Sequence, residues 1–152
     1  MKIRYRIGKA PSPQPALGGS LQRPRPYLPV RLFAANLTVF LDGHLDTGAD
    51  DTVFPEHVAH NLGIDLSKAQ HYSINLAGRG PLQCRYAMVT LRITDGVLET
   101  YEWDAMVGFV PVPLKFPLLG FAGFFQFFDV DFHGGDLEVF ITPHRNFPGR
   151  IF

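Results

Sequence analysis

The stretch His44–Pro55, HLDTGADDTVFP, places three aspartates within six residues, directly after an apolar run. Asp46 stands between Leu45 and a Thr-Gly pair, and Gly48 lets the backbone turn sharply and approach a bound group closely. One carboxylate buried at such a turn is costly, whereas two that face each other can share a proton. One of the pair then acts as a base toward water and the other as an acid toward a carbonyl, which hydrolyses amides without a metal or a covalent intermediate.

The composition favours a single domain rich in strands. The 152 residues are 46% hydrophobic, which is enough for one core, and fourteen Phe with thirteen Pro argue against a helical bundle. A net charge of zero does not favour nucleic-acid binding. No apolar run approaches the roughly 20 residues that span a bilayer, and the first residues lack the apolar core of a signal peptide. Cys84 is the only cysteine, so no internal disulfide or cysteine-based zinc site is possible, and we expect a cytoplasmic protein without a cofactor.

The charge is unevenly distributed along the chain. Residues 1–31 hold seven bases and no acid, whereas the remaining residues hold fourteen acids and seven bases. We expect the basic segment to lie on the acidic body of its own chain or of a second subunit; an acidic partner or lipid headgroups are the alternative.

An N-terminal arm, residues 1–26, precedes a body of residues 27–152. Residues 1–8 alternate apolar and basic side chains, which predicts a half-exposed strand. Its apolar face would otherwise be wet, which favours an interface strand over a cover for the cleft. Residues 10–26 are rich in Pro, Gly and Ser, which predicts an irregular connector or a mobile arm.

The body is predicted to be mainly β, with one or two short helices. Residues 26–35 and 37–48 form a hairpin, residues 71–93 form a long hairpin around Gly78-Arg79-Gly80-Pro81, and residues 97–110 form a further strand. Pro55 and Gly63 bound a short helix. The apolar segment 116–128 predicts a strand end and then a short buried helix through Phe124, Phe127 and Phe128, with the Phe cluster as core. Residues 129–141 form a hairpin that turns at Gly134-Gly135.

The segment LDTGADDTVFP resembles the active-site segment of retropepsin-like aspartic proteases, the family of the retroviral proteases and their bacterial relatives. The signature of that family is a hydrophobic residue followed by Asp-Thr-Gly-Ala. A second family element, two apolar residues and a Gly followed by a short helix, is similar to Leu118-Leu119-Gly120. The resemblance covers about Tyr27 to Ile141 and implies an all-β fold, the closed acid-protease barrel.

The resemblance also implies a homodimer, because this chain carries one Asp-Thr-Gly and pepsin-like members carry two. The implied activity is that of an aspartic endopeptidase acting on a peptide or protein substrate. Its catalytic residues would be Asp46, contributed by each subunit to activate a water, Thr47, bonded across the two-fold axis, and Gly48, in backbone contact with substrate. A flap from Leu76 to Leu82 would close over the peptide and exclude water. The implied substrate-binding residues are Ala49, Asp50, Asp51, Gly78, Arg79, Gly80 and Leu119.

This sequence departs from the viral pattern in three places. Phe121-Ala122 stand where viral members have Arg and then Asp or Asn. In those relatives the Arg pairs with an acid just after Asp-Thr-Gly-Ala, so the ionic partner of Asp50 is open here. A base of the N-terminal arm is one candidate. Arg79 puts a charge on the flap tip. The N-terminal extension has no obvious counterpart.

Three other interpretations remain open. The chain could be a catalytically inactive, dimeric peptide-binding module of the same fold, or Asp46 could be an ordinary turn residue. A metal hydrolase would use His44, Asp46, His57 and His60, of which the last two share a face of the predicted helix. The sequence contains no His-Glu-x-x-His motif, so we expect no metal site.

Overall fold

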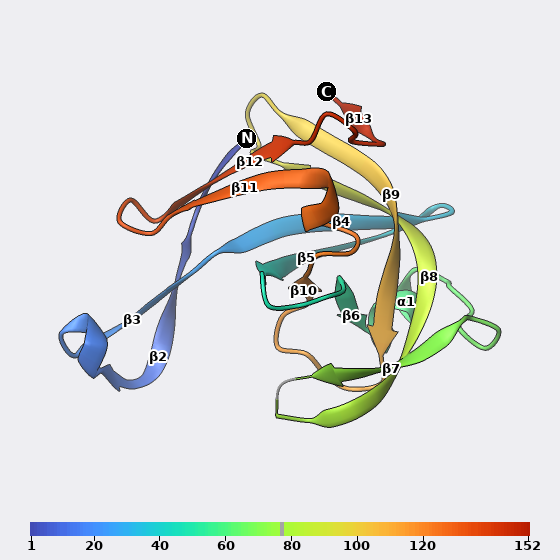
Figure 1. The fold of residues 1–152 in the computed structure, drawn as a ribbon, viewed down its shortest axis with the longest axis horizontal. Coiled ribbons are helices and arrows are strands. Elements are labelled where there is room, and N and C mark those ends of the chain that lie inside the picture. The colour runs from blue at the N-terminus through green and yellow to red at the C-terminus, as the bar shows by residue number, and fades with distance from the viewer. Residues whose placement is uncertain (77) are drawn as a thin grey trace.

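A closed ring of strands carries the body of the protein, as the computed structural model of residues 1–76 and 78–152 shows (Figure 1). The largest sheet has the strand order β13-β9-β6-β10-β5-β4-β8-β7, and an additional pairing between β8 and β9 closes the strands from β9 to β8 into a ring, with β13 and β7 attached to it. The strands of this sheet are β4 (Tyr27–Ala34), β5 (Leu37–Leu45), β6 (Val53–Pro55), β7 (His71–Leu76), β8 (Gly80–Thr94), β9 (Thr100–Val110), β10 (Leu118–Leu119) and β13 (Arg150–Ile151). The predictions of a mainly β fold and a closed barrel are confirmed.

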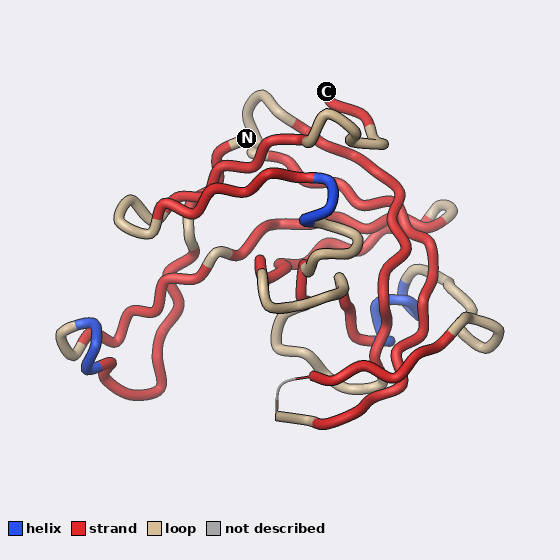
Figure 2. Tube along the Cα trace, viewed as in Figure 1, coloured by secondary structure: helices blue, strands red, loops and turns tan. Residues whose placement is uncertain are grey.

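Two smaller sheets complete the structure (Figure 2). One has the order β1-β12-β11, and the other pairs β2 with β3. Their strands and the three helical segments are β1 (Lys2–Arg4), β2 (Arg6–Gln14), β3 (Ser20–Arg25), β11 (Phe128–His133), β12 (Glu138–Pro143), the 3₁₀ turns η1 (Pro15–Leu17) and η2 (Phe125–Phe127), and the helix α1 (Glu56–Asn61). No helix within the two described ranges is long and apolar enough to cross a membrane.

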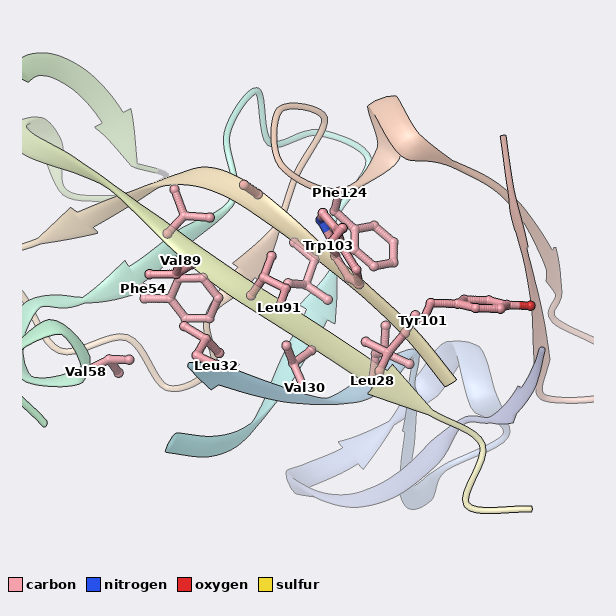
Figure 3. Close-up of a cluster of buried hydrophobic side chains, with 14 of the residues drawn as sticks. Leu28, Val30, Leu32, Phe54, Val58, Val89, Leu91, Tyr101, Trp103 and Phe124 are labelled. Carbon is pink, nitrogen blue, oxygen red and sulfur yellow. The ribbon is translucent and has the colours of Figure 1, made fainter. Parts of the chain in front are cut away.

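The core lies inside the ring, and the period-two pattern of the strands builds it (Figure 3). Every second side chain is buried along three long strands: Leu28, Val30 and Leu32 in β4; Val89, Leu91 and Ile93 in β8; Tyr101, Trp103, Ala105 and Val107 in β9. Each large side chain of this kind contributes about 1.5–3 kcal/mol by leaving water. The indole N–H of Trp103 donates to the carbonyl of Gly123 at 3.0 Å, so its polar atom is satisfied. The predicted Phe cluster joins this core, with Phe124 and Phe128 both buried.

Local signals placed the helix and the hairpins correctly. Helix α1 follows Pro55, buries Val58 and Ala59, and is followed by Gly63 in a left-handed conformation. Strands β4 and β5 pair from Tyr27 to His44, and the predicted hairpins in residues 71–93 and 129–141 are present.

The helix predicted around Phe124 is a single 3₁₀ turn instead. Phe128, which was assigned to that helix, is already extended and is the first residue of β11. All six residues of β11 pair with β12, and this ladder competes with any helix that would continue past Phe127. A tertiary pairing therefore overrides the helical spacing of the three Phe residues.

The N-terminal arm differs from its prediction in two ways. Strand β1 pairs antiparallel with β12, and Met1, Ile3 and Tyr5 pack against the protein's own main core. Three of the four apolar side chains of residues 1–8 are thus covered within one chain, while Ile7 is exposed. The premise that the whole apolar face would be wet without a partner was wrong. The expectation that the arm lies on its own acidic body is confirmed for three bases: Lys2 and Arg4 pair with Glu138, and Arg6 pairs with Asp42.

Residues 10–26 are not an irregular connector, because most of them belong to the two-stranded ribbon β2–β3, which projects away from the body (Figure 1). Pro24 lies opposite Ile7 in this ribbon, so its missing N–H must face the outer edge. Pro24 therefore removes no hydrogen bond between the two strands.

Candidate active site

The two segments singled out in the sequence come together where β10 lies between β5 and β6. Leu118 and Leu119 pair in parallel with His44 and Leu45, and Leu118 also pairs with Val53. The N–H of Asp46 donates to the carbonyl of Leu119 at 3.1 Å, which extends this parallel ladder by one bond. Asp46 therefore leaves the sheet at a position fixed by its neighbours on both sides.

A tight turn holds the carboxylate of Asp46. Its Oδ1 accepts the N–H of Gly48 at 3.0 Å, and its carbonyl accepts the N–H of Ala49 at 3.1 Å. The side chain of Asp46 is half-buried, whereas Thr47 and Gly48 are exposed. The turn orients one carboxylate oxygen and presents the Asp-Thr-Gly segment at the surface of the single chain.

A second ladder fastens the segment after the turn. Phe121 N–H donates to the Ala49 carbonyl at 2.9 Å, and Ala122 N–H donates to the Asp50 carbonyl at 2.8 Å. Thr52, which is buried, accepts the N–H of Gly120 on its hydroxyl at 3.2 Å. The aspartate loop and the segment after β10 thus form one braced unit.

A cleft of about 470 Å³ opens beside this unit. Its lining consists of Gly48–Asp51 from the loop, Tyr72–Leu76 from strand β7, and the side chains of Val53, Tyr86 and Leu118. The loop contributes backbone groups and the carboxylates of Asp50 and Asp51 to this lining. Apolar side chains contribute to the same lining. The lining of the cleft thus mixes polar and apolar groups, and polar groups placed in such a cleft can orient an organic ligand.

The predicted site residues divide between the cleft and its surroundings. Four of them line it, namely Gly48, Ala49, Asp50 and Asp51, whereas Asp46 and Thr47 precede that lining. Leu119 is fully buried in the core, and its neighbour Leu118 lines the cleft in its place.

The predicted flap forms the tip of the β7–β8 hairpin. Gly78, Arg79 and Gly80 are exposed there, and both glycines have left-handed backbones, with φ of 76° and 70°. Arg79 N–H closes the turn on the Leu76 carbonyl at 3.0 Å. Leu76 lines the cleft, and Ala77, which belongs to the predicted flap, lies outside the described residues.

Tyr86 is a site residue that the sequence did not reveal. Its hydroxyl donates to Asp51 Oδ2 at 3.0 Å, and both residues line the cleft. Burial, with Cys84 and the Asp51 carboxylate adding to it, raises the pKa of the Tyr86 phenol far above its ordinary value, so the phenol remains a donor. Only the pairing register of β8 brings Tyr86 to Asp51, and no local pattern announces it.

Replacing Tyr86 by Phe should lower the free energy of unfolding by about 1.5 kcal/mol, because the half-buried Asp51 carboxylate loses a hydrogen-bond donor. Urea denaturation measures this change. Tyr72→Phe is the matched control, since the Tyr72 ring packs edge-on against Tyr86 and its side chain is exposed. Equal stability of the two variants would show that the hydrogen bond contributes nothing.

Two observations describe the ionic surroundings of the site. Asp50 is exposed and takes part in none of the ion pairs formed by residues 1–76 and 78–152; Arg6 of the arm pairs with Asp42 instead. Across those same residues, no three His, Cys, Asp or Glu side chains are grouped as a metal site requires. His57 and His60 are exposed on α1, while burial lowers the pKa of His44 against the opposing effect of Asp46.

Comparison with known proteins gives matches among solved structures. No family model matches the chain, and no curated protein matches it. The EIAV protease complexed with the inhibitor HBY-793 is 24% identical, with a TM-score of 0.48, and the match covers 63% of this chain and 81% of that one. A retropepsin-like aspartic protease from Rickettsia conorii is 20% identical, with a TM-score of 0.46, and the match covers 93% of this chain and 95% of that one.

Proposed function

We propose that this protein is an aspartic endopeptidase that acts as a homodimer, with Asp46 of each subunit contributing one carboxylate to a shared site. The observation that carries the proposal is the placement of Asp46. It leaves a closed barrel on a turn held by the Gly48 N–H and the Leu119 carbonyl, beside a cleft of about 470 Å³.

One Asp46 supplies half of the required chemistry. Amide hydrolysis without a metal needs a base that takes a proton from water and an acid that protonates the carbonyl oxygen. Two carboxylates about 3 Å apart divide these tasks, because only one of them ionises readily. The chain contains one Asp-Thr-Gly turn, and its Thr47 and Gly48 are exposed, so a second copy can approach the turn about a two-fold axis.

The cleft suits an extended peptide. Strand β7 lies on one side of the cleft and the aspartate loop on the other, so backbone groups are available on both sides of a bound chain. Val53, Ile74 and Leu118 offer apolar contacts for alternate side chains. The β7–β8 hairpin, with its two left-handed glycines, is the element that would close over the peptide.

Cleavage of a peptide library at acid pH, over a range of enzyme concentrations, tests this proposal. We expect cleavage that a pepstatin-type transition-state mimic inhibits and a chelator leaves unchanged. Specific activity should fall on dilution, because the dimer that holds both carboxylates dissociates.

Each contrary result has a distinct meaning. Peptide binding without cleavage would identify an inactive peptide-binding module, and loss of activity with the chelator would indicate a metal hydrolase. A species that sediments as a monomer and keeps full specific activity at every dilution would contradict the shared site.

A further inference from the structure

A second hollow, which we call the basic groove, lies where the β2–β3 ribbon meets the body. Its volume is about 340 Å³. Four Lys and Arg side chains line it, three from the arm and one from the segment before β10. The full lining is Gly8, Lys9, Pro11, Arg23, Arg25, Tyr27, His44, Lys115 and Phe116.

The groove concentrates positive charge without an acid. Within the part of the chain that the structure describes, no ion pair involves Lys9, Arg23, Arg25 or Lys115, whereas Lys2, Arg4 and Arg6 of the same arm all pair with acids. Like charges gathered in one hollow repel one another and create a local positive potential that attracts an anion. The arrangement therefore favours an anionic ligand.

The floor of the groove is aromatic. The rings of Tyr27 and Phe116 stack with their centroids 4.1 Å apart, and the His44 ring meets Tyr27 edge-on at 5.4 Å. The ammonium of Lys115 lies 5.7 Å from the centre of the Phe116 ring. An apolar floor below a rim of bases suits a chain whose side chains end in carboxylates and whose stems are aliphatic.

The groove and the cleft lie along the same two segments, on either side of Asp46. In one segment His44 lines the groove and Gly48 lines the cleft; in the other, Lys115 lines the groove and Leu118 lines the cleft. The N–H of His44 donates to the Pro117 carbonyl at 2.8 Å, which ties these segments together. An extended peptide advances about 3.3 Å per residue, so we expect a chain that lies along these two segments to pass from one hollow to the other.

We propose that the basic groove binds acidic side chains of the peptide substrate, so that the protease selects sequences with several Asp or Glu residues next to the cleaved bond. This inference rests on the proposed function, since it names the substrate class of the same site. A peptide is favoured over a nucleic acid because the chain has no net charge and the groove adjoins a cleft that apolar side chains line in part.

Binding can be tested separately from catalysis in the full chain carrying Asp46→Asn. Fluorescein-labelled hexaglutamate and hexaglutamine peptides are the probes, with fluorescence anisotropy as the readout. We expect hexaglutamate to bind about tenfold more tightly or better, and less so at high salt, because several exposed charge pairs contribute. The double substitution Arg25→Glu and Lys115→Glu should remove this preference. The control pair Arg145→Glu and Arg150→Glu makes the same charge change at exposed sites outside the groove lining and should retain the preference.

The outcomes separate the two proposals. If the protein cleaves peptides and the Asp46→Asn chain binds both probes equally, the groove proposal fails and the proposed peptidase function is retained. If hexaglutamate binds selectively and no peptide is cleaved, the peptidase function fails and the groove still binds acidic side chains. A hexathymidylate that binds as tightly as hexaglutamate would overturn the assignment to peptides. If the groove variant alters sedimentation of the chain and leaves hexaglutamate binding unchanged, the groove is a subunit contact and the proposal fails.

Discussion

Replacing Asp46 by Asn should abolish peptide hydrolysis and leave the fold intact. Asn has nearly the same shape, and its amide oxygen can still accept the Gly48 N–H that Oδ1 accepts at 3.0 Å. The amide cannot take a proton from water, and in a symmetric dimer both copies lose that capacity together. Loss of general acid–base catalysis alone should reduce the cleavage rate by about 10²–10⁴-fold. Peptide cleavage at fixed enzyme concentration measures the loss, and thermal denaturation checks the fold.

Asp136→Asn is the matched control for this substitution. Asp136 is exposed in the turn between β11 and β12 and belongs to neither the cleft nor the groove. The Asp136→Asn substitution removes one carboxylate from the chain, as Asp46→Asn does, and this control variant should retain full activity. Undiminished cleavage by the Asp46→Asn protein would mean that Asp46 is an ordinary turn residue.

Replacing Gly120 by Ala should destabilise the protein by about 3 kcal/mol or more, which is the largest stability effect that we expect near the site. A Cβ at this position would lie 2.3 Å from the Asp51 carbonyl oxygen and 2.7 Å from that of Ala49. Both atoms are backbone, and the Ala49 carbonyl is held by the N–H of Phe121. Overpacking that cannot relax through a flexible side chain belongs to the costly class of substitutions.

Urea denaturation of Gly120→Ala and Gly134→Ala provides the comparison. A Cβ at Gly134 meets no heavy atom within 4 Å, so that variant should stay within about 0.5 kcal/mol of the parent protein. Gly120→Ala should also lose activity, because the same unit positions Asp46. Similar stability of the two variants would show that the aspartate loop moves aside without cost, and that it is not the braced unit described above.

Much of the fold was predictable, because its signals are local. Apolar, strand-like runs bounded by turn residues predicted β4, β8 and β9, and Pro55 with Gly63 bounded the helix. The Asp-Thr-Gly turn and Leu118-Leu119-Gly120 were predicted to belong to one site, and the structure brings them together. The errors fall where pairing between strands overrides composition or spacing. Residues 10–26 are mostly paired in a two-stranded ribbon despite their prolines, and Phe128 belongs to a strand that takes it away from the predicted helix.

The sequence by itself predicted the kind of element that most segments form and the turn at Asp46, since both depend on residues close together in the chain. The tertiary structure alone decided which distant groups meet. It brings Tyr86 to Asp51, gathers Lys115 with the bases of the arm, and buries Leu119 while Leu118 faces the cleft. The physical reason is register: a shift of one residue between paired strands turns every side chain to the opposite face, and the packing of the whole barrel core, which no local pattern specifies, selects the register.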